Sequence, residues 1–115
     1  MRKIIADTHA HTIVSGHAYS TIREMASAAK RRGIQVQALT EHAPKMPGTC
    51  GLYYFQNLDV IPREMDGVRM LFGAELNIMD PEGNVDLPEN YSTPTIPTHN
   101  KNYLHPHPHA HHFLL

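Results

Sequence analysis

The sequence predicts an α/β fold with short parallel strands, and three observations support this prediction. A short apolar run within residues 3–8 is typical of a buried parallel strand. Apolar residues at helical spacing follow from residue 22, and a second apolar run lies at residues 34–40. Strand, helix and strand in this order form a βαβ unit, whose two strands are parallel and whose crossover is right-handed.

The ends of the predicted helix are marked by capping signals. Thr21 is followed three residues later by Glu24, which is the pattern of a capping box. The basic residues 30–32 suit the negative end of a helix dipole, and Gly33 ends the helix. We interpret this basic trio as a helix C-terminus in preference to a phosphate-binding site.

The rest of the first 88 residues continues the same alternation. Residues 9–18 and 43–52 are predicted loops, and residues 53–65 are predicted to be partly helical, with Pro62 as an interruption. A third strand is expected at residues 70–78. After a turn at residues 81–84, residues 85–87 are expected to pair back as a short strand.

The last part of the chain has a different composition. From residue 89 onward prolines recur and histidine alternates with proline, so no helical or strand period remains. We therefore divide the chain into a partial domain, residues 1–88, and an irregular His/Pro-rich tail, residues 89–115, which we expect to be disordered and to reflect truncation or a frameshift. Six of the ten histidines lie here, and we read them as compositional in preference to a flexible metal-binding tract: His99, His105, His107, His109, His111 and His112.

Length and charge limit the classes of protein. The chain has 115 residues, whereas a closed (β/α)8 barrel takes about 250. A formal net charge of −1 gives no basic field for nucleic acid, and no apolar run approaches the ~20 residues of a membrane span. Cys50 is the single cysteine, which excludes an intramolecular disulfide and fits a cytoplasmic protein.

Candidate metal ligands follow the first predicted strand. His9 and His11 are two residues apart, and in extended backbone such positions point to the same side, so two imidazoles can converge on one cation. Asp7 shares that side and could support a ligand. An isolated His-x-His motif is more often two surface histidines than a metal site, so further ligands are needed.

The next two strands end in similar residues. Glu41 and His42 end the second strand, and Glu75 ends the third. Catalytic residues of α/β barrels lie at the C-terminal ends of parallel strands, and imidazole with carboxylate suits zinc, manganese or iron. Glu41 could instead be a solvated loop carboxylate. Glu75 interrupts an apolar run, where a carboxylate is costly without a cation or strong donors. His17, taken alone, is more often an exposed loop histidine.

These motifs together resemble a known family. The sequence DTHAHT at residues 7–12, SGHAYST at 15–21, TEHAP at 40–44 and GAELNI at 73–78 is similar to the opening motifs of PHP-domain proteins, in particular their YcdX-like bacterial phosphatase branch. The resemblance extends from about residue 4 to residue 87. It implies that these residues form the N-terminal portion of a distorted (β/α)7 barrel.

The resemblance also implies a function. PHP proteins of this branch hold a three-metal cluster, usually zinc, that hydrolyses phosphate esters, so the expected partner is a small phosphorylated substrate. By this resemblance His9 and His11 would bind the first metal, Glu75 would bridge the first and second, and His17 and His42 would bind the third. The resemblance adds no catalytic residue beyond these ligands. Glu41 departs from the aspartate common in the family.

Two alternatives stay open beside the metal-dependent phosphatase. The family's other ligands, two histidines and a late Asp-x-His pair, lie beyond the part that this chain matches, so a non-catalytic metal-binding or partner-binding fragment is one alternative. A PHP-type nuclease is the other, although the His17 setting and the lack of basic patches argue against it. Whether this chain is itself an active enzyme, which substrate it takes and its oligomeric state stay open.

Overall fold

A computed structural model of the chain describes residues 2–87 and the strand at residues 111–114. Three strands form its parallel core, in the spatial order β1 (Ala6–Asp7), β2 (Val36–His42) and β4 (Val68–Asn77). Two short strands pair with β4 in the antiparallel sense, namely β3 (Glu64–Met65) and β5 (His111–Leu114). The predicted α/β class and the parallel βαβ unit are confirmed. That this sheet is the N-terminal portion of a distorted (β/α)7 barrel stays an expectation.

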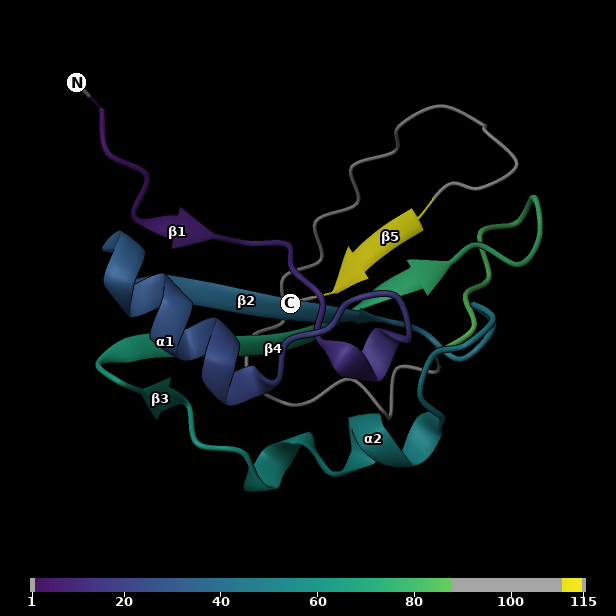
Figure 1. The fold of residues 1–115 in the computed structure, drawn as a ribbon. Coiled ribbons are helices and arrows are strands. Elements are labelled where there is room, and N and C mark those ends of the chain that lie inside the picture. Colours follow the sequence, from purple (N-terminus) through teal and green to yellow (C-terminus); the bar gives the residue numbers. More distant parts are fainter. Residues whose placement is uncertain (1, 88–110, 115) are drawn as a thin grey trace.

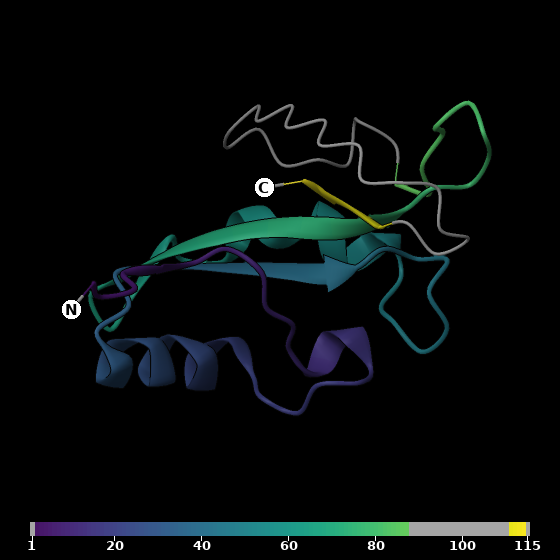
Figure 2. The same cartoon turned by 90° about the horizontal axis from the view of Figure 1, so that it is seen from above.

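The sheet separates the helical elements in space. Figure 2 shows α1 (Ile22–Arg32) and the 3-10 turn at Ile13–Ser15 on one side of β1, β2 and β4. Helix α2 (Leu52–Gln56) and a second 3-10 turn (Leu58–Val60) lead back to β3 (Figure 1). The buried core joins these elements through Ala26, Leu39, Phe55, Met70 and Phe72.

The first strand is shorter and more exposed than predicted. Only Ala6 and Asp7 pair with β2, at Val36 and Gln37. Ile4 is 74% exposed and Ile5 is 50% exposed, so the expectation that this apolar run is buried is wrong. β1 pairs with β2 alone, which leaves this run little to pack against among the described residues.

Helix α1 begins and ends where the sequence predicts. The Thr21 hydroxyl accepts a hydrogen bond from the backbone N–H of Glu24, and the Glu24 carboxylate accepts one from the backbone N–H of Thr21 at 2.7 Å. Gly33 closes the helix with φ at 74°, in the left-handed region that glycine adopts without strain. These caps fix the length of the crossover between β1 and β2.

Removing the capping hydroxyl should destabilise the chain modestly. We expect Thr21→Ala to lower the free energy of unfolding by about 1 kcal/mol, because the backbone N–H of Glu24 loses its partner. Urea denaturation followed by far-UV circular dichroism would measure this loss. Ser27→Ala, at a half-buried position within the same helix, is the matched control, because the Ser27 hydroxyl bonds the Arg31 side chain and caps no backbone N–H. An equal loss there would contradict the capping explanation.

A hairpin that was not predicted from the sequence connects β3 to β4. Asp66 and Gly67 have φ of 54° and 78°, which is the backbone of a two-residue turn with both central residues in the left-handed region. An Asp-Gly pair is a strong signal for such a turn, so the hairpin was readable from the sequence. The predicted helical character of residues 53–65 holds for α2 and the second 3-10 turn only.

The final strand lies within the segment predicted to be an irregular tail. β5 pairs with β4 from Ala74↔Leu114 to Asn77↔His111, on the edge opposite β2. This strand was not predicted from the sequence. The rest of that segment, residues 89–110 and 115, lies outside the described residues. Upstream, the predicted return of residues 85–87 is found as a single antiparallel bridge between Ile78 and Val85.

Candidate metal centre

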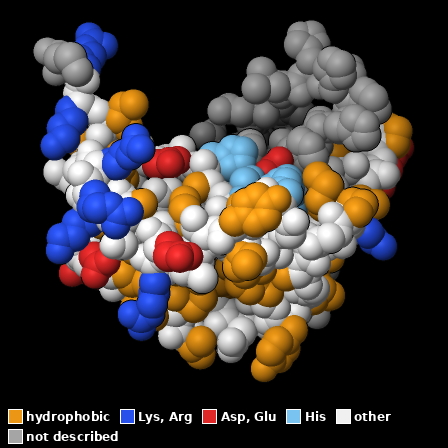
Figure 3. All heavy atoms as spheres, viewed as in Figure 1, with side chains coloured by type: hydrophobic (Ala, Val, Ile, Leu, Met, Phe, Trp, Pro, Cys, Tyr) orange, Lys and Arg blue, Asp and Glu red, His pale blue; other side chains and the backbone are white. Residues whose placement is uncertain are grey.

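The five candidate ligands lie together at the C-terminal edge of the parallel strands. His42, the last residue of β2, pairs in register with Glu75 near the end of β4. His9 and His11 follow β1, and His17 follows the 3-10 turn. Figure 3 shows histidine side chains gathered at one place on the surface, with an acidic side chain beside them. The parallel pairing of three strands therefore brings residues from four segments to one edge.

Glu75 lies at the centre of the first group. Its Oε2 is 3.2 Å from Nε2 of His9 and 3.0 Å from Nε2 of His11. The same oxygen is 3.4 Å from Nδ1 of His42. The Glu75 side chain is only 7% exposed, so three imidazoles surround a carboxylate that has little access to water. The three imidazoles offset the cost of placing a carboxylate within an apolar strand.

The second group contains three histidines. Nε2 of His17 lies 2.7 Å from Nε2 of His42. The rings of His11 and His42 are stacked with centroids 4.4 Å apart, and the His17 ring meets the His11 ring edge-on at 5.1 Å. His17 is exposed, as a loop histidine alone would be, yet its ring nitrogen faces the cluster.

The geometry and the donor types suit a divalent cation. The ligand atoms of His9, His11 and Glu75 all lie within 4.8 Å of one another, and so do those of His11, His17 and His42. Two donors bound to one tetrahedral zinc at about 2.0–2.1 Å are about 3.3 Å apart, which is close to these separations. Imidazole nitrogen with carboxylate oxygen is a set that zinc, manganese and iron accept. His11 belongs to both groups.

The electrostatics of His11 favour its ligand form. Burial lowers its pKa below the usual histidine value, although the nearby Glu75 carboxylate acts in the opposite direction. The positive charge of an imidazolium at neighbouring His9 adds to the lowering. A lowered pKa keeps the imidazole neutral near neutral pH, and only the neutral ring offers a lone pair to a metal.

Asp7 supports this site through the backbone. Its Oδ1 accepts a hydrogen bond from the backbone N–H of His9 at 3.1 Å. The carboxylate therefore holds the turn that leads from β1 into the cluster. The sequence predicted that Asp7 would support a ligand, and the contact is with the main chain of that ligand.

Glu41 is buried, so the alternative of a solvated loop carboxylate is wrong. Its side chain is fully buried and accepts hydrogen bonds from the two residues at the ends of the 3-10 turn, its N-cap Thr12 and its last residue Ser15. The Thr12 backbone N–H lies 3.1 Å from each carboxylate oxygen, and the Thr12 hydroxyl donates at 2.5 Å. The Ser15 hydroxyl donates to the second oxygen at 2.5 Å. Glu41 thus ties β2 to the turn that carries His11 and His17.

Thr12 and Ser15 were not singled out from the sequence as site residues. Both are buried, and Ser15 lies 3.1 Å from Nδ1 of His11 through its Oγ. The same Oγ accepts a hydrogen bond from the backbone N–H of His42 at 3.0 Å. The signal that could have found them is the pair of hydroxyl residues that lies between two candidate ligands, His11 and His17.

Gly16 is required where the turn approaches the next loop. Its φ is 78°, and a Cβ at this position would lie 2.1 Å from the carbonyl oxygen of Gly48. That oxygen belongs to the backbone, so it cannot move aside as a flexible side chain would. The close approach fixes the 3-10 turn against the loop after β2, and it does so one residue before His17.

A side chain at position 16 should disturb the site. We expect Gly16→Ala to lower the free energy of unfolding by about 1–3 kcal/mol, because a left-handed backbone and a backbone clash both oppose it. Chemical denaturation would measure the change. Gly83→Ala is the matched control, since its φ is also positive, at 86°, but nothing lies within 4 Å of the added Cβ. Equal losses of unfolding free energy in the two variants would show that the positive φ, and not the clash with Gly48, causes the destabilisation.

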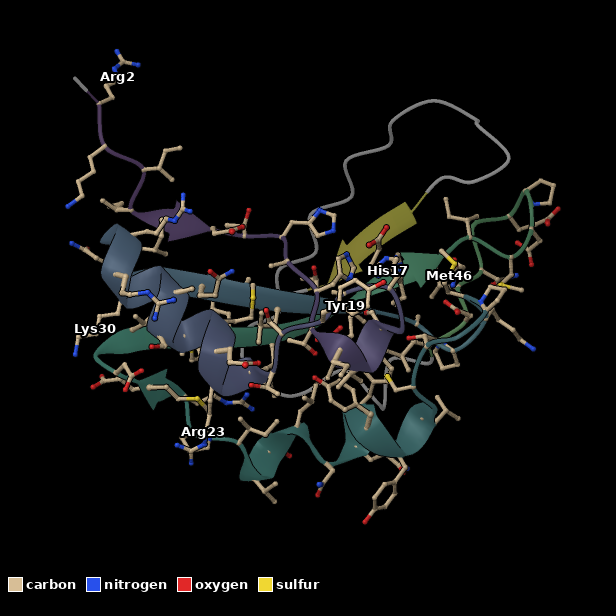
Figure 4. The ribbon with its side chains drawn as sticks, viewed as in Figure 1. Arg2, His17, Tyr19, Arg23, Lys30 and Met46 are labelled. Atoms are coloured by element: carbon tan, nitrogen blue, oxygen red, sulfur yellow. The ribbon has the colours of Figure 1, made fainter. Side chains whose placement is uncertain are left out.

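The basic side chains that Figure 4 labels lie away from this centre. In Figure 4, Arg2 and Lys30 are at the end of the molecule opposite His17, and Arg23 points away from it, whereas Tyr19, two residues further along the chain, is drawn close to it. Tyr19 is 88% exposed. The basic trio at the end of α1, which includes Lys30, is therefore not near the histidine cluster, in line with its interpretation as a helix C-terminus.

Comparisons with known proteins point in one direction. The PHP domain family matches residues 7–114. The chain is 58% identical over 87 residues to a probable phosphatase of Thermoanaerobacter sp. (strain X514), which covers 76% of this chain and 36% of that protein. It is 54% identical over 89 residues to a probable phosphatase of Acetivibrio thermocellus, with 77% and 37% covered. A probable phosphatase of Photobacterium profundum is 51% identical over 87 residues, with 76% and 35% covered.

The extent of these matches differs between the two comparisons. The chain spans little more than a third of the length of these curated relatives. The family match continues to residue 114, and so includes the segment beyond residue 88. Among residues 2–87 and 111–114, no helix has the length and apolar character needed to cross a membrane.

Proposed function

We propose, since this chain belongs to the PHP domain family, that its cluster of four histidines and Glu75 is part of a divalent-metal site that serves phosphate-ester hydrolysis. One observation carries the proposal: five nitrogen and oxygen donors from the segment after β1, from β2, from β4 and from the loop before α1 converge at the C-terminal edge of a parallel sheet. That edge is where α/β barrel enzymes place their chemistry.

The residues divide into two sets of metal ligands. His9, His11 and Glu75 would hold one cation, and His17 and His42 would hold another, with His11 within reach of both. Zinc fits the donor types best, and manganese or iron is compatible with them. Divalent cations at such positions supply Lewis-acid polarisation of a phosphoryl group and a water of lowered pKa.

The chain's own side chains provide binding and orientation. Glu75 offers negative charge to a cation from a position that is almost excluded from water. His9, whose side chain is 44% exposed, and His17, which is also exposed, leave the cluster open on one side to a small ligand. No side-chain nucleophile is needed, because water supplies the oxygen that attacks phosphorus and the ester oxygen leaves as an alcohol.

The substrate class is a small phosphorylated molecule. Support comes from the relatives, which are named probable phosphatases. A second function is a metal-binding chain without turnover. It is favoured by the finding that five donors already meet within residues 9–75, while the chain spans little more than a third of those relatives.

Metal content and turnover should be measured on the same samples. We expect the purified, tag-free chain to retain zinc or manganese in elemental analysis, and the His9→Ala/His11→Ala variant to lose it. Hydrolysis of p-nitrophenyl phosphate that depends on the added metal, and that disappears in the variant, would support the phosphatase. Bound metal without hydrolysis would support the second function. Equal metal in both proteins would contradict both.

A further inference from the structure

The buried contacts of Glu41 connect it, through Ser15, to two of the candidate ligands. Glu41 lies outside both ligand groups, yet its contact Ser15 lies between two of their members. Glu41 is fully buried and Ser15 is 2% exposed, so neither has water as a ready substitute partner. The donors and acceptors here can therefore be assigned by counting.

Ser15 has one proton to donate and two lone pairs with which to accept. The Glu41 carboxylate accepts four contacts from Thr12 and Ser15, and in its ionised form it can only accept. The Ser15 proton therefore goes to Glu41, at 2.5 Å. The backbone N–H of His42 donates to one lone pair of Ser15 at 3.0 Å.

One lone pair of Ser15 then remains, and it faces His11. Nδ1 of His11 is 3.1 Å from Ser15 Oγ. Because the proton of Ser15 is already committed to Glu41, the hydrogen of this contact must come from His11 Nδ1. A neutral imidazole with its proton on Nδ1 has a bare lone pair on Nε2, and Nε2 is the atom that faces His9 and Glu75.

We propose that Glu41 is a positioning residue that acts through Ser15 to keep the proton of His11 on Nδ1, so that Nε2 is free to bind a cation. An opposing influence is present, because Glu75 lies 3.0 Å from the same Nε2 and would favour a proton there. The pair of Glu41 and Ser15 shifts this balance toward the ligand form. Partners of a metal-binding histidine commonly set its tautomer and orientation in this way.

The inference rests on the proposed metal site, but its first test does not need metal. In the metal-free chain at about pH 8, where most histidines are neutral, nitrogen-15 chemical shifts report the tautomer of each ring. We expect His11 to have a larger Nδ1–H population in the native chain than in Glu41→Gln. A glutamine amide presents a donor to Thr12 or to Ser15, so the assignment of the Ser15 proton is lost.

Ser15→Ala is the second variant, in case Glu41→Gln fails to fold. It removes the acceptor for His11 and leaves Glu41 with the donors of Thr12. We expect the same shift of the His11 proton toward Nε2. Glu82→Gln is the matched control, because Glu82 is exposed and lies in the turn after β4, and it should leave the tautomer unchanged.

Zinc affinity gives the second readout. Titration against a chromophoric chelator should show zinc binding weakened roughly 10- to 100-fold in Ser15→Ala and in Glu41→Gln if it folds, with the control unchanged. An unchanged His11 tautomer in the variants would overturn the positioning role, even if zinc binding weakens. If the variants shift the His11 tautomer but the native chain binds no zinc, the tautomer assignment is upheld and the proposed metal function is rejected.

Discussion

Replacing His11 with alanine is expected to remove metal binding from both ligand groups at once. His11 is the one residue that belongs to both, and its Nε2 lies 3.0 Å from His9 and from Glu75. Apparent zinc-binding free energies of about 10–16 kcal/mol are shared among four ligands, so one ligand contributes a few kcal/mol. The affinity for zinc should therefore fall on the order of 100-fold or more.

Single substitutions outside this shared position should have narrower effects. His9→Ala removes a ligand only from the group with Glu75, and His17→Ala removes one only from the group with His42. Each variant should keep binding at the other group. Isothermal titration with zinc, performed on all three variants, would separate these cases, and circular dichroism would confirm that each chain is folded. If His11→Ala binds zinc as tightly as His9→Ala does, His11 is not shared.

The position of the candidate ligands could be predicted because it follows from topology. Three parallel strands, the first two joined by a crossover helix, place the residues at or just after the ends of β1, β2 and β4 at one edge, whatever the details of packing. The alternation of short apolar runs with one capped helix was enough to predict this arrangement. The ends of α1 were also predictable, because Thr21, Glu24 and Gly33 act on neighbouring backbone groups.

The role of Glu41 could not be predicted in the same way. Its partners Thr12 and Ser15 are 29 and 26 residues away along the chain, and only the folded structure brings them into contact. A carboxylate at the end of a strand is compatible with a ligand, a solvated group or a buried acceptor. Local pattern does not distinguish these three, because they differ in tertiary contacts and not in spacing.

Errors at the periphery have a similar origin. The run that begins with Ile4 and Ile5 reads as a buried strand, but burial depends on what packs against it, and β1 pairs with β2 alone. β5 depends on pairing with β4 across more than 30 residues of sequence. The local period of apolar residues predicts neither the exposure of Ile4 and Ile5 nor the pairing of β5 with β4.

Glu41→Ala is expected to be the most destabilising single substitution in the site. It leaves the backbone N–H and the hydroxyl of Thr12 without their acceptor in a buried place, and it leaves the Ser15 hydroxyl with Nδ1 of His11 as its alternative acceptor. Each unsatisfied buried donor costs about 1–3 kcal/mol, so we expect the free energy of unfolding to fall by about 3 kcal/mol or more. Urea denaturation would measure this, with Glu82→Ala as an exposed control.

A double-mutant cycle tests whether the loss arises from these contacts. Thr12→Val removes the hydroxyl that donates to Glu41 at 2.5 Å, while the shape of the side chain is kept. If the unsatisfied donor is the cause, Glu41→Ala should cost less in the Thr12→Val background than in the native chain, because one orphaned donor is already gone. A coupling of about 1–3 kcal/mol is expected. Additive losses would instead assign the effect to the cavity left by the carboxylate, since a cavity is indifferent to the Thr12 hydroxyl.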